Sequence, residues 1–511
     1  MKRPGLMIAA PCSGSGKTTF TTGLLAALSA RGETVYAYKC GPDYIDPMYH
    51  TAALGVPSRN LDTFFTDEEM TRRLYLEDPD PGCHIVEGVM GLYDGVAGTE
   101  ETGSSYDLAR VLGLPILLVV NARGQGRSLI ALLKGFQALD HADLIRGVVL
   151  NQISGEMYAR LAPLIEEGTG LACLGYLPKE EGLTAPGRHL GLLAPGELPD
   201  TYICKVRETV ERQLDWERFF RILNSAERPK TGAEAENVNL RESVGASAPA
   251  AESASGRTGT GGESGREAVS EHLPETMAEH GTETVSETAT EPLRLAVARD
   301  AAFSFCYTDN LRMLERAGAE LIYFSPLTDP HLPEDCDGLL LSGGYPELSA
   351  KQLSENQNLL REIRAAVTGG LPTVAECGGF LYLQQTLKDP EGHPYQMAGA
   401  LPGTAEDKKH PVRFGYVTLW EKEPLFLPEG TVCRGHEFHY YDSTENGSSC
   451  HVEKPVTGRS WDAVVTTETL WAGFPHVYYP ACPAFVTAFV SKMRACRERK
   501  LKQKEHEAPN N

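Results

Sequence analysis

The stretch that decides the fold is APCSGSGKTT at residues 10–19, which stands between an apolar run at residues 5–10 and an amphipathic run at residues 19–30. This order predicts a strand, a tight loop and a helix. Glycines in such a loop let backbone N–H groups converge on an anion, and the helix adds the positive end of its dipole. The stretch therefore predicts a phosphate-binding loop.

The loop supplies the candidate nucleotide-binding residues Gly14, Ser15, Gly16, Lys17, Thr18 and Thr19. Lys17 offers a point charge for the outer phosphates, and the Thr18 hydroxyl is a candidate Mg2+ ligand. In the general pattern G-x-x-x-x-G-K-[ST] the first glycine would fall at Pro11, so the motif is only similar to that pattern. The alternative is a glycine-rich turn with a surface lysine, and the strand–turn–helix context favours the nucleotide.

Length and composition are those of a globular enzyme. The 511 residues are enough for about two to four domains, and 41% hydrophobic with 23% charged residues is ordinary for a soluble protein. No apolar run reaches about 18 residues and no signal-peptide pattern is present, which predicts a cytoplasmic protein that does not enter membranes. Twelve cysteines without a C-x-x-C pair argue against a disulfide framework and against structural zinc.

Charge is distributed unevenly along the chain. The net charge of −21 disfavours nucleic acid as a partner. Residues 225–292 contain no Phe, Tyr or Trp and are rich in Glu, Ala, Ser, Thr and Gly, which predicts a disordered acidic linker. The chain then divides into a domain at residues 1–224, a domain at residues 293–490 and a charged tail at residues 491–511, expected to be a solvated helix end.

The first half alternates short apolar runs with helix-length segments, which predicts an α/β parallel sheet. Its expected strands are residues 5–10, 34–39, 84–89, 115–121, 147–152 and 172–177. Ligands of such sheets bind beyond the carboxyl ends of the strands.

Carboxylates gather at that edge of the predicted sheet. Asp43 and Asp46 follow the second strand, in KCGPDYIDP at residues 39–47, and Glu87 ends the third strand. We expect Glu87, with Thr18, to order Mg2+. Each acid alone is more often a turn or cap residue, but together they favour a catalytic cluster. Asn151 ends another strand, and the sequence favours neither of two roles for it: a contact with the adenine or the formation of a turn.

The second half begins with further strand–helix alternation, with strands expected at residues 293–299, 320–325, 338–342 and 372–375. The turn SGGYPE at residues 342–347 is suited to presenting backbone N–H groups to an oxyanion. Cys377 stands at a sharp strand-to-helix turn, the geometry of a nucleophile elbow. We expect the helix N-terminus to lower the pKa of its thiol.

A cysteine nucleophile needs a base, and His476 is the best candidate. His436, His439 and His451 compete with it. The segment HEFH at residues 436–439 is unlike the zinc pattern H-E-x-x-H, because its histidines are three rather than four residues apart.

Both halves resemble one family, the cobyrinic acid a,c-diamide synthases of the cobalamin pathway. In that family a dethiobiotin-synthetase-like ATP domain precedes a class I glutamine amidotransferase domain. The motifs that carry the resemblance are the loop at residues 10–19 with its Pro11, KCGPDYIDP (39–47), EGVMGLYDG (87–95), SGGYPE (342–347), ECGG (376–379) and GHEFHY (435–440). The fold it implies is a P-loop parallel-sheet domain, joined by the linker to a flavodoxin-like glutamine amidotransferase α/β domain.

The resemblance implies a complete reaction. ATP with Mg2+ would phosphorylate acetate carboxylates of cobyrinic acid, with Asp43 and Asp46 as catalytic acids of the ATP site. Cys377 would release ammonia from L-glutamine with His476 as its base, and free ammonia would substitute for glutamine. The wider class places an acid two residues after the histidine, where Tyr478 stands here, so the group that orients His476 is not identified.

Competing functions remain open at this point. The macrocycle could instead be hydrogenobyrinic acid or nickel-sirohydrochlorin. The enzyme could also be a cobyric acid synthase, although residues 39–47 resemble the a,c-diamide enzymes. A more distant alternative is a non-enzymatic P-loop ATPase switch, against which Cys377 and His476 argue. A homo-oligomer is compatible with the sequence.

Overall fold

The computed structural model describes residues 2–180, 182–183, 200–231 and 291–507. Most of the linker expected at residues 225–292, and the last residues of the expected tail, lie outside the described residues. The two α/β domains belong to one compact unit, formed by residues 1–231 and 292–511.

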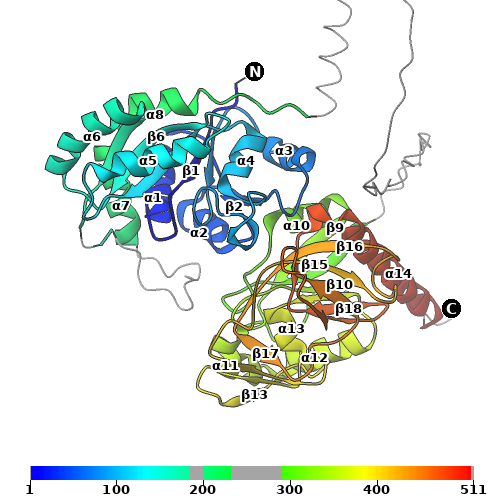
Figure 1. Ribbon diagram of the computed structural model, residues 1–511. Helices are drawn as coiled ribbons and strands as arrows, with labels where there is room; N and C mark the ends of the chain where they lie inside the picture. The colour runs from blue at the N-terminus through cyan, green and yellow to red at the C-terminus, as the bar shows by residue number, and fades with distance from the viewer. Residues whose placement is uncertain (1, 181, 184–199, 232–290, 508–511) are drawn as a thin grey trace, which may run out of the picture. The chain divides into compact units, whose positions relative to one another are not determined.

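The N-terminal domain is built on a seven-stranded parallel sheet with the order β3-β2-β4-β1-β5-β6-β7. In Figure 1 this domain runs from blue at its N-terminus to green. Six strands confirm the expected alternation, and β3 was not expected. The strands are β1 (Gly5–Ala9), β2 (Val35–Cys40), β3 (Ser58–Leu61), β4 (Cys83–Glu87), β5 (Ile116–Asn121), β6 (Ile145–Asn151) and β7 (Ala172–Leu177).

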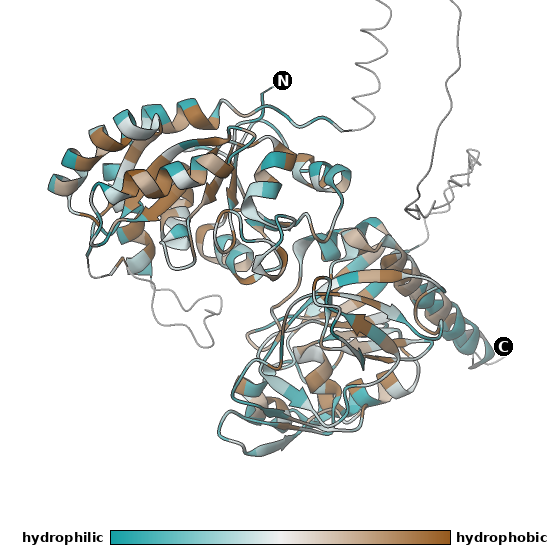
Figure 2. Ribbon diagram, viewed as in Figure 1, coloured by the Kyte–Doolittle hydropathy of each residue, from teal (hydrophilic) through white to brown (hydrophobic). Residues whose placement is uncertain are grey.

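Helices cover both faces of this sheet, which is why most of its strands read as nearly continuous apolar runs and are brown along most of their length in Figure 2. In β1, Leu6 and Ile8 pack with α1 (Lys17–Ala30), α7 (Asp200–Gln213) and α8 (Trp216–Leu223). Met7 and Ala9 face the opposite layer. The helices of that layer are α3 (Glu68–Leu76), α4 (Ser105–Leu112), α5 (Ser128–Leu139) and α6 (Gly155–Thr169).

The C-terminal domain contains a six-stranded sheet with the order β20-β21-β11-β10-β8-β9, in which only β20 is antiparallel to its neighbour. Its strands are β8 (Leu293–Ala298), β9 (Ala319–Phe324), β10 (Gly338–Leu341), β11 (Thr373–Glu376), β20 (Val465–Thr466) and β21 (Leu470–Gly473). Its helices are α10 (Thr308–Arg316), α11 (Ala350–Glu355), α12 (Gln357–Thr368), α13 (Gly378–Leu383) and α14 (Pro483–Glu507). The four expected strands are β8 to β11.

Two further sheets follow α13 that the sequence reading did not include. One has the order β19-β18-β15-β16-β22, and the other has the order β13-β12-β14-β17. Their strands are β12 (Thr386–Lys388), β13 (Pro394–Gln396), β14 (Thr404–Asp407), β15 (Arg413–Glu421), β16 (Val432–His439), β17 (Tyr441–Ser443), β18 (Cys450–Glu453), β19 (Ser460–Ala463) and β22 (His476–Val477).

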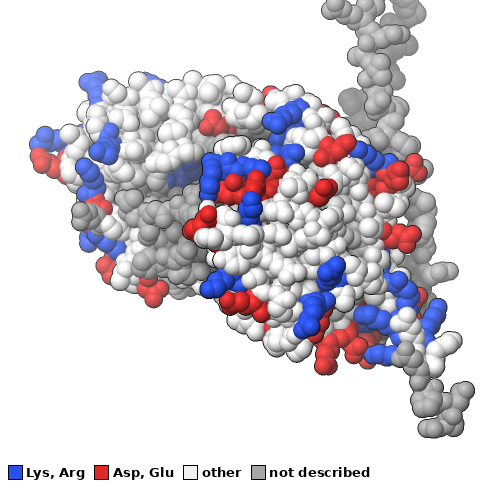
Figure 3. Space-filling model, turned by 90° about the horizontal axis from the view of Figure 1, so that it is seen from below, with Lys and Arg blue, Asp and Glu red and all other residues white. Residues whose placement is uncertain are grey.

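The C-terminal helix α14 runs across residue 490, where the sequence suggested that the domain ends. Met493 and Cys496 on it are buried, so the helix packs on the domain beyond that position. Among the described residues, no helix is both long and apolar enough to cross a membrane. Acidic and basic side chains lie interspersed on the face shown in Figure 3.

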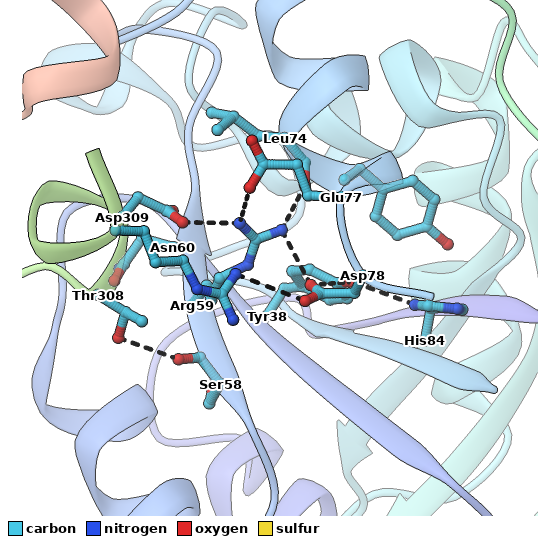
Figure 4. A network of polar contacts seen from close by, with 12 residues as sticks. Tyr38, Ser58, Arg59, Asn60, Leu74, Glu77, Asp78, His84, Thr308 and Asp309 are labelled. Atoms are coloured by element: carbon cyan, nitrogen blue, oxygen red, sulfur yellow. Dashed lines mark hydrogen bonds and ion pairs between the residues drawn. The ribbon is translucent and has the colours of Figure 1, made fainter. Parts of the chain in front are cut away.

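A buried ion-pair network joins the two α/β domains (Figure 4). Arg59 of β3 is 1% exposed and lies 2.7 Å from Asp309 of α10, 2.9 Å from Asp78 and 3.0 Å from Glu77. The Tyr478 hydroxyl donates to the second oxygen of Asp309 at 2.9 Å. Both Asp309 and Tyr478 belong to the C-terminal domain, so this network connects β3 to the residues that follow His476.

Candidate active sites

The phosphate-binding loop lies between β1 and α1, as expected. Gly14 and Gly16 have φ angles of 78° and 101°, a region that favours glycine. A Cβ on Gly16 would also overlap the side-chain amide of Asn151. That amide donates to the Ser15 carbonyl at 2.9 Å, so Asn151 supports the loop, a role different from the two considered from the sequence.

The structure brings the expected acids together around a lysine that the motif contains. Strands β2 and β4 are neighbours, and Lys39 lies opposite Glu87 in their register. The Lys39 amino group is 2.6 Å from Asp46 and 3.0 Å from Glu87, and the Thr18 hydroxyl donates to the same Glu87 oxygen at 2.7 Å. Burial opposes the charge on Lys39, but the Asp46 and Glu87 carboxylates outweigh it and raise its pKa. Lys39 therefore stays protonated between the two acids.

Asp43 has the turn role that was weighed from the sequence, and it also lies near Asp46. Its carboxylate accepts from the Ile45 N–H at 2.9 Å, at the start of α2 (Ile45–Leu54). Burial and the neighbouring Asp46 raise its pKa to about 6. The Asn60 amide donates to the Asp43 carbonyl at 2.7 Å and fixes the loop.

Two further features of this site were not expected. His50 is fully buried on α2, and its Nε2 lies 3.8 Å from Glu87; burial lowers its pKa, so the ring is neutral. Its position four residues after Asp46, on the same face of α2, is the signal that could have indicated it. The Lys17 amino group donates to the Met90 carbonyl, and burial lowers its pKa to about 8.

Cys377 is at the apex between β11 and α13. Its φ of 47° and ψ of −102° are strained for a residue with a side chain, as in a nucleophile elbow. The neighbouring glycines are required by space: a Cβ on Gly378 would come within 2.9 Å of the Gly344 nitrogen, and one on Gly379 would overlap the Leu341 carbonyl. The turn at residues 342–347 is thus packed directly against the elbow.

The expected low pKa of Cys377 is wrong. Cys377 is 8% exposed, and burial raises the pKa of its thiol. The six-residue helix α13 does not offset the loss of hydration. A base is therefore needed to make the thiolate.

Glu376, which the sequence did not indicate as a site residue, lies beside His476 on β22. Its Nδ1 lies 3.7 Å from a carboxylate oxygen of Glu376, the residue before the nucleophile, and the other Glu376 oxygen accepts from the Val477 N–H at 3.1 Å. Its Nε2 lies 3.1 Å from the hydroxyl of Tyr44, which comes from the acid loop of the N-terminal domain. A carboxylate thus lies next to the His476 ring, although no acid stands at Tyr478.

The turn at residues 342–347 also contacts the histidine. A Cβ on Gly343 would overlap the His476 ring, so the turn fits against it only because this residue is glycine. Glu347, at the end of the turn, is buried, and burial raises its pKa to about 8. This carboxyl group is therefore largely neutral at pH 7.

The competing histidines have other surroundings. His436 on β16 lies directly opposite His476 in the strand register, and burial and His476 lower its pKa to about 3. His439 stacks on Phe474 with ring centroids 3.8 Å apart, and His451 lies 3.6 Å from Asp462. Among the described residues, no group of three or more His, Cys, Asp or Glu side chains is arranged to hold a metal ion.

Comparisons with known proteins agree with this division of the chain. Residues 6–193 match the family model described as the CobQ/CobB/MinD/ParA nucleotide binding domain, and residues 294–480 match the CobB/CobQ-like glutamine amidotransferase domain. Proteins named cobyrinate a,c-diamide synthase are similar over nearly the whole chain. That of Gloeobacter violaceus is 38% identical over 85% of each chain. That of Salmonella typhimurium is 35% identical over 96% of this chain and 98% of its own, and that of Priestia megaterium is 32% identical over 98% and 99%.

Proposed function

Because the chain belongs to the cobyrinate a,c-diamide synthase family, we propose that it converts cobyrinic acid to the a,c-diamide with ATP and L-glutamine. A carboxylate is a poor electrophile at neutral pH, whereas an acyl phosphate carries a good leaving group. Phosphorylation by ATP followed by attack of ammonia therefore gives the amide and phosphate. This logic requires a nucleotide site and an ammonia source in one protein.

The observation that carries the proposal is a single cavity of about 850 Å³ that reaches both sites. Asp43 of the acid loop and Cys377 of the elbow both line it. Ammonia made at Cys377 can thus meet an acyl phosphate near Asp43 within the same cavity. Release of the ammonia close to the acyl phosphate limits its protonation and its loss to bulk water.

In the ATP site, the backbone N–H groups of residues 14–19 and the Lys17 amino group hold the phosphates. Lys39 keeps Asp46 and Glu87 close together, and Asp43 is placed beside Asp46 by its hydrogen bond to α2. These carboxylates position the acetate group and the transferred phosphoryl group.

The same site has groups suited to Mg2+. The Thr18 hydroxyl and the Glu87 carboxylate are oxygen donors in direct contact, and the buried Oε2 atom of Glu87 has no hydrogen-bond partner among the described residues. Mg2+ prefers few protein oxygens together with phosphates and water. When bound, the ion neutralises phosphate charge.

In the glutaminase site, His476 takes the Cys377 proton and Sγ attacks the glutamine amide carbon. Backbone N–H groups of the elbow and of the adjacent turn hold the oxyanion. The amide nitrogen leaves as ammonia with a proton from His476, and water then hydrolyses the thioester to glutamate. Glu376 keeps the ring of His476 in orientation through these steps.

The test is incubation of the purified protein with Mg-ATP, glutamine and one of three macrocycles: cobyrinic acid, hydrogenobyrinic acid or nickel-sirohydrochlorin. Mass spectrometry is expected to show two successive amidations of cobyrinic acid. If none of the three macrocycles gave an amidated product, the proposal of an a,c-diamide synthase would be refuted. If only one of the other two macrocycles were amidated, that macrocycle and not cobyrinic acid would be the substrate.

The roles of the two sites are tested with Cys377→Ala. This variant is expected to lose amidation with glutamine and to retain it with ammonium chloride. Cys204→Ala, at an exposed cysteine, is the matched control and keeps both activities. Loss of both activities in Cys377→Ala alone would contradict the division of labour.

A further inference from the structure

The cavity has one wall whose purpose neither catalytic site explains. This wall is the ribbon of β15 and β16, from which Phe414, Tyr416, His436 and Phe438 line the cavity. In the antiparallel register Phe414 lies opposite Phe438, and Tyr416 lies opposite His436. Directly opposed residues point to the same face of a sheet, so these four rings form one aromatic face.

The other face of the ribbon belongs to the domain core. Val417, Leu419 and Cys433 alternate with the aromatic residues and are buried in the hydrophobic cluster of the C-terminal domain. Phe414 and Phe438 are therefore not needed to close the core, whereas Tyr416 also packs against the core of the N-terminal domain and donates to Asp62 at 2.7 Å. Phe414 is 62% exposed, although its ring lies 5.3 Å from that of Phe438.

Other apolar side chains around the cavity are also open to solvent. Val456 is 43% exposed and Met90, from the N-terminal domain, is 36% exposed. Contiguous exposed apolar surface of this kind marks a binding site for a ligand with a large apolar area. A single glutamine, which is small and polar, does not match it.

Basic groups stand beside the aromatic face. Lys454 lines the cavity, and its amino group donates to the carbonyls of Phe414 at 2.7 Å and Tyr416 at 3.1 Å. Arg459 lines the cavity as well, and among the described residues no carboxylate forms an ion pair with it. A guanidinium group in that position is suited to bind a ligand carboxylate.

We propose that this aromatic face, with Lys454 and Arg459 beside it, binds the ring of a flat macrocycle that carries peripheral carboxylates. The inference rests on the proposed function and adds to it that the glutamine amidotransferase domain holds the macrocycle, while the acid loop of the ATP domain activates its acetate groups. The volume of about 850 Å³ lies in the upper part of the range for small-molecule sites, as a substrate of this size requires.

The test is equilibrium binding of cobyrinic acid to the full chain, followed by quenching of protein fluorescence. Phe414→Ala is expected to raise the Kd about tenfold, because the stacked ring is lost. Arg459→Gln is expected to raise it about threefold to tenfold and to weaken its dependence on salt. Val432→Ala is the matched control, since Val432 is 53% exposed on the same ribbon but does not line the cavity.

The melting temperature of all three variants is expected to match that of the wild type, which shows that they fold. Wild-type affinity in both Phe414→Ala and Arg459→Gln would overturn this inference and leave the proposed function standing. Loss of affinity in Val432→Ala as large as in Phe414→Ala would overturn it too. Failure of the wild-type protein to bind any of the three macrocycles would refute the proposed function and the inference together.

Discussion

At the scale of single residues, the contact between Tyr44 and His476 is the most consequential. Placing the His476 proton on Nδ1, which faces the Glu376 carboxylate, makes Nε2 the acceptor of the Tyr44 O–H. The lone pair that accepts this hydrogen bond is the one that a base needs for the Cys377 proton. In the proposed mechanism, the Tyr44 hydroxyl therefore competes with the Cys377 thiol for Nε2 of His476.

Tyr44→Phe removes this competition. We expect glutamine hydrolysis without ATP and macrocycle to rise about twofold to tenfold, as loss of a hydrogen bond of about 0.5–1.5 kcal/mol implies. Glutamate release is the measurement. Tyr307→Phe is the control, because the buried Tyr307 hydroxyl donates at 2.9 Å to Pro42 and not to His476. A basal rate in Tyr44→Phe equal to or below that of wild type would disprove the competition.

Glu347 gives a prediction about pH. Burial raises its pKa from 4.5 to about 8, so between these values the folded protein keeps a proton that the unfolded chain has lost. Its contribution to stability is therefore present below about pH 4.5 and is lost as the pH rises toward 8. Glu347→Gln stays neutral throughout, so its melting temperature should exceed that of wild type more at pH 8 than at pH 5. Equal differences at the two pH values would refute the burial of this carboxyl group.

At the scale of elements, the sequence predicted those strands whose residues form a short, continuous apolar run. Six strands of the parallel sheet are buried on both faces and read as apolar runs, whereas β3 reads SRNL and carries Arg59 and Asn60, which are buried by polar contacts. Strands β15 and β16 alternate aromatic, polar and small residues, because one face lines the cavity. The sequences of β3, β15 and β16 therefore do not identify these segments as strands unless it is known what packs against each face of the strand.

The same limit applies to the candidate site. The loop at residues 10–19, Asp43, Asp46, Glu87, Cys377 and His476 stand in motifs and could be named from the sequence. Tyr44 and Glu376 lie inside the same motifs, but their contacts with His476 join positions about 100 to 430 residues apart, which spacing alone does not reveal. The raised pKa of Cys377 depends on burial, which is a property of the folded chain.

A substitution in the turn at residues 342–347 tests whether this turn holds the His476 ring in place. Gly343→Ala places a methyl group where the His476 ring lies, so we expect the ring to shift and glutamine-driven amidation to fall about tenfold or more. Ammonia-driven amidation should stay within about twofold, because the ATP site is untouched. Gly135→Ala on α5 is the control, since its Cβ would meet open space. Equal loss of both activities would show that the turn does not act through His476.

At the scale of the whole molecule, the buried Arg59 network connects the two α/β domains. Asp309→Ala would leave the Arg59 guanidinium and the Tyr478 hydroxyl without this acceptor. We expect a loss of about 1.5–3 kcal/mol in the free energy of unfolding, measured in urea, because a buried hydrogen bond to a charged group is removed. Asp462→Ala, at a pair whose carboxylate is 46% exposed, should cost no more than about 1 kcal/mol. An equal loss of unfolding free energy in both variants would show that the Arg59 network does not stabilise the contact between the two domains.

The joint action of the two domains is tested most directly by isotope tracing. Wild-type protein is given Mg-ATP, cobyrinic acid and glutamine labelled with 15N in its amide group, in the presence of excess unlabelled ammonium. Because Cys377 and Asp43 line one cavity, we expect both new amides to carry 15N from glutamine. Amides with the isotope composition of the ammonium pool would contradict it.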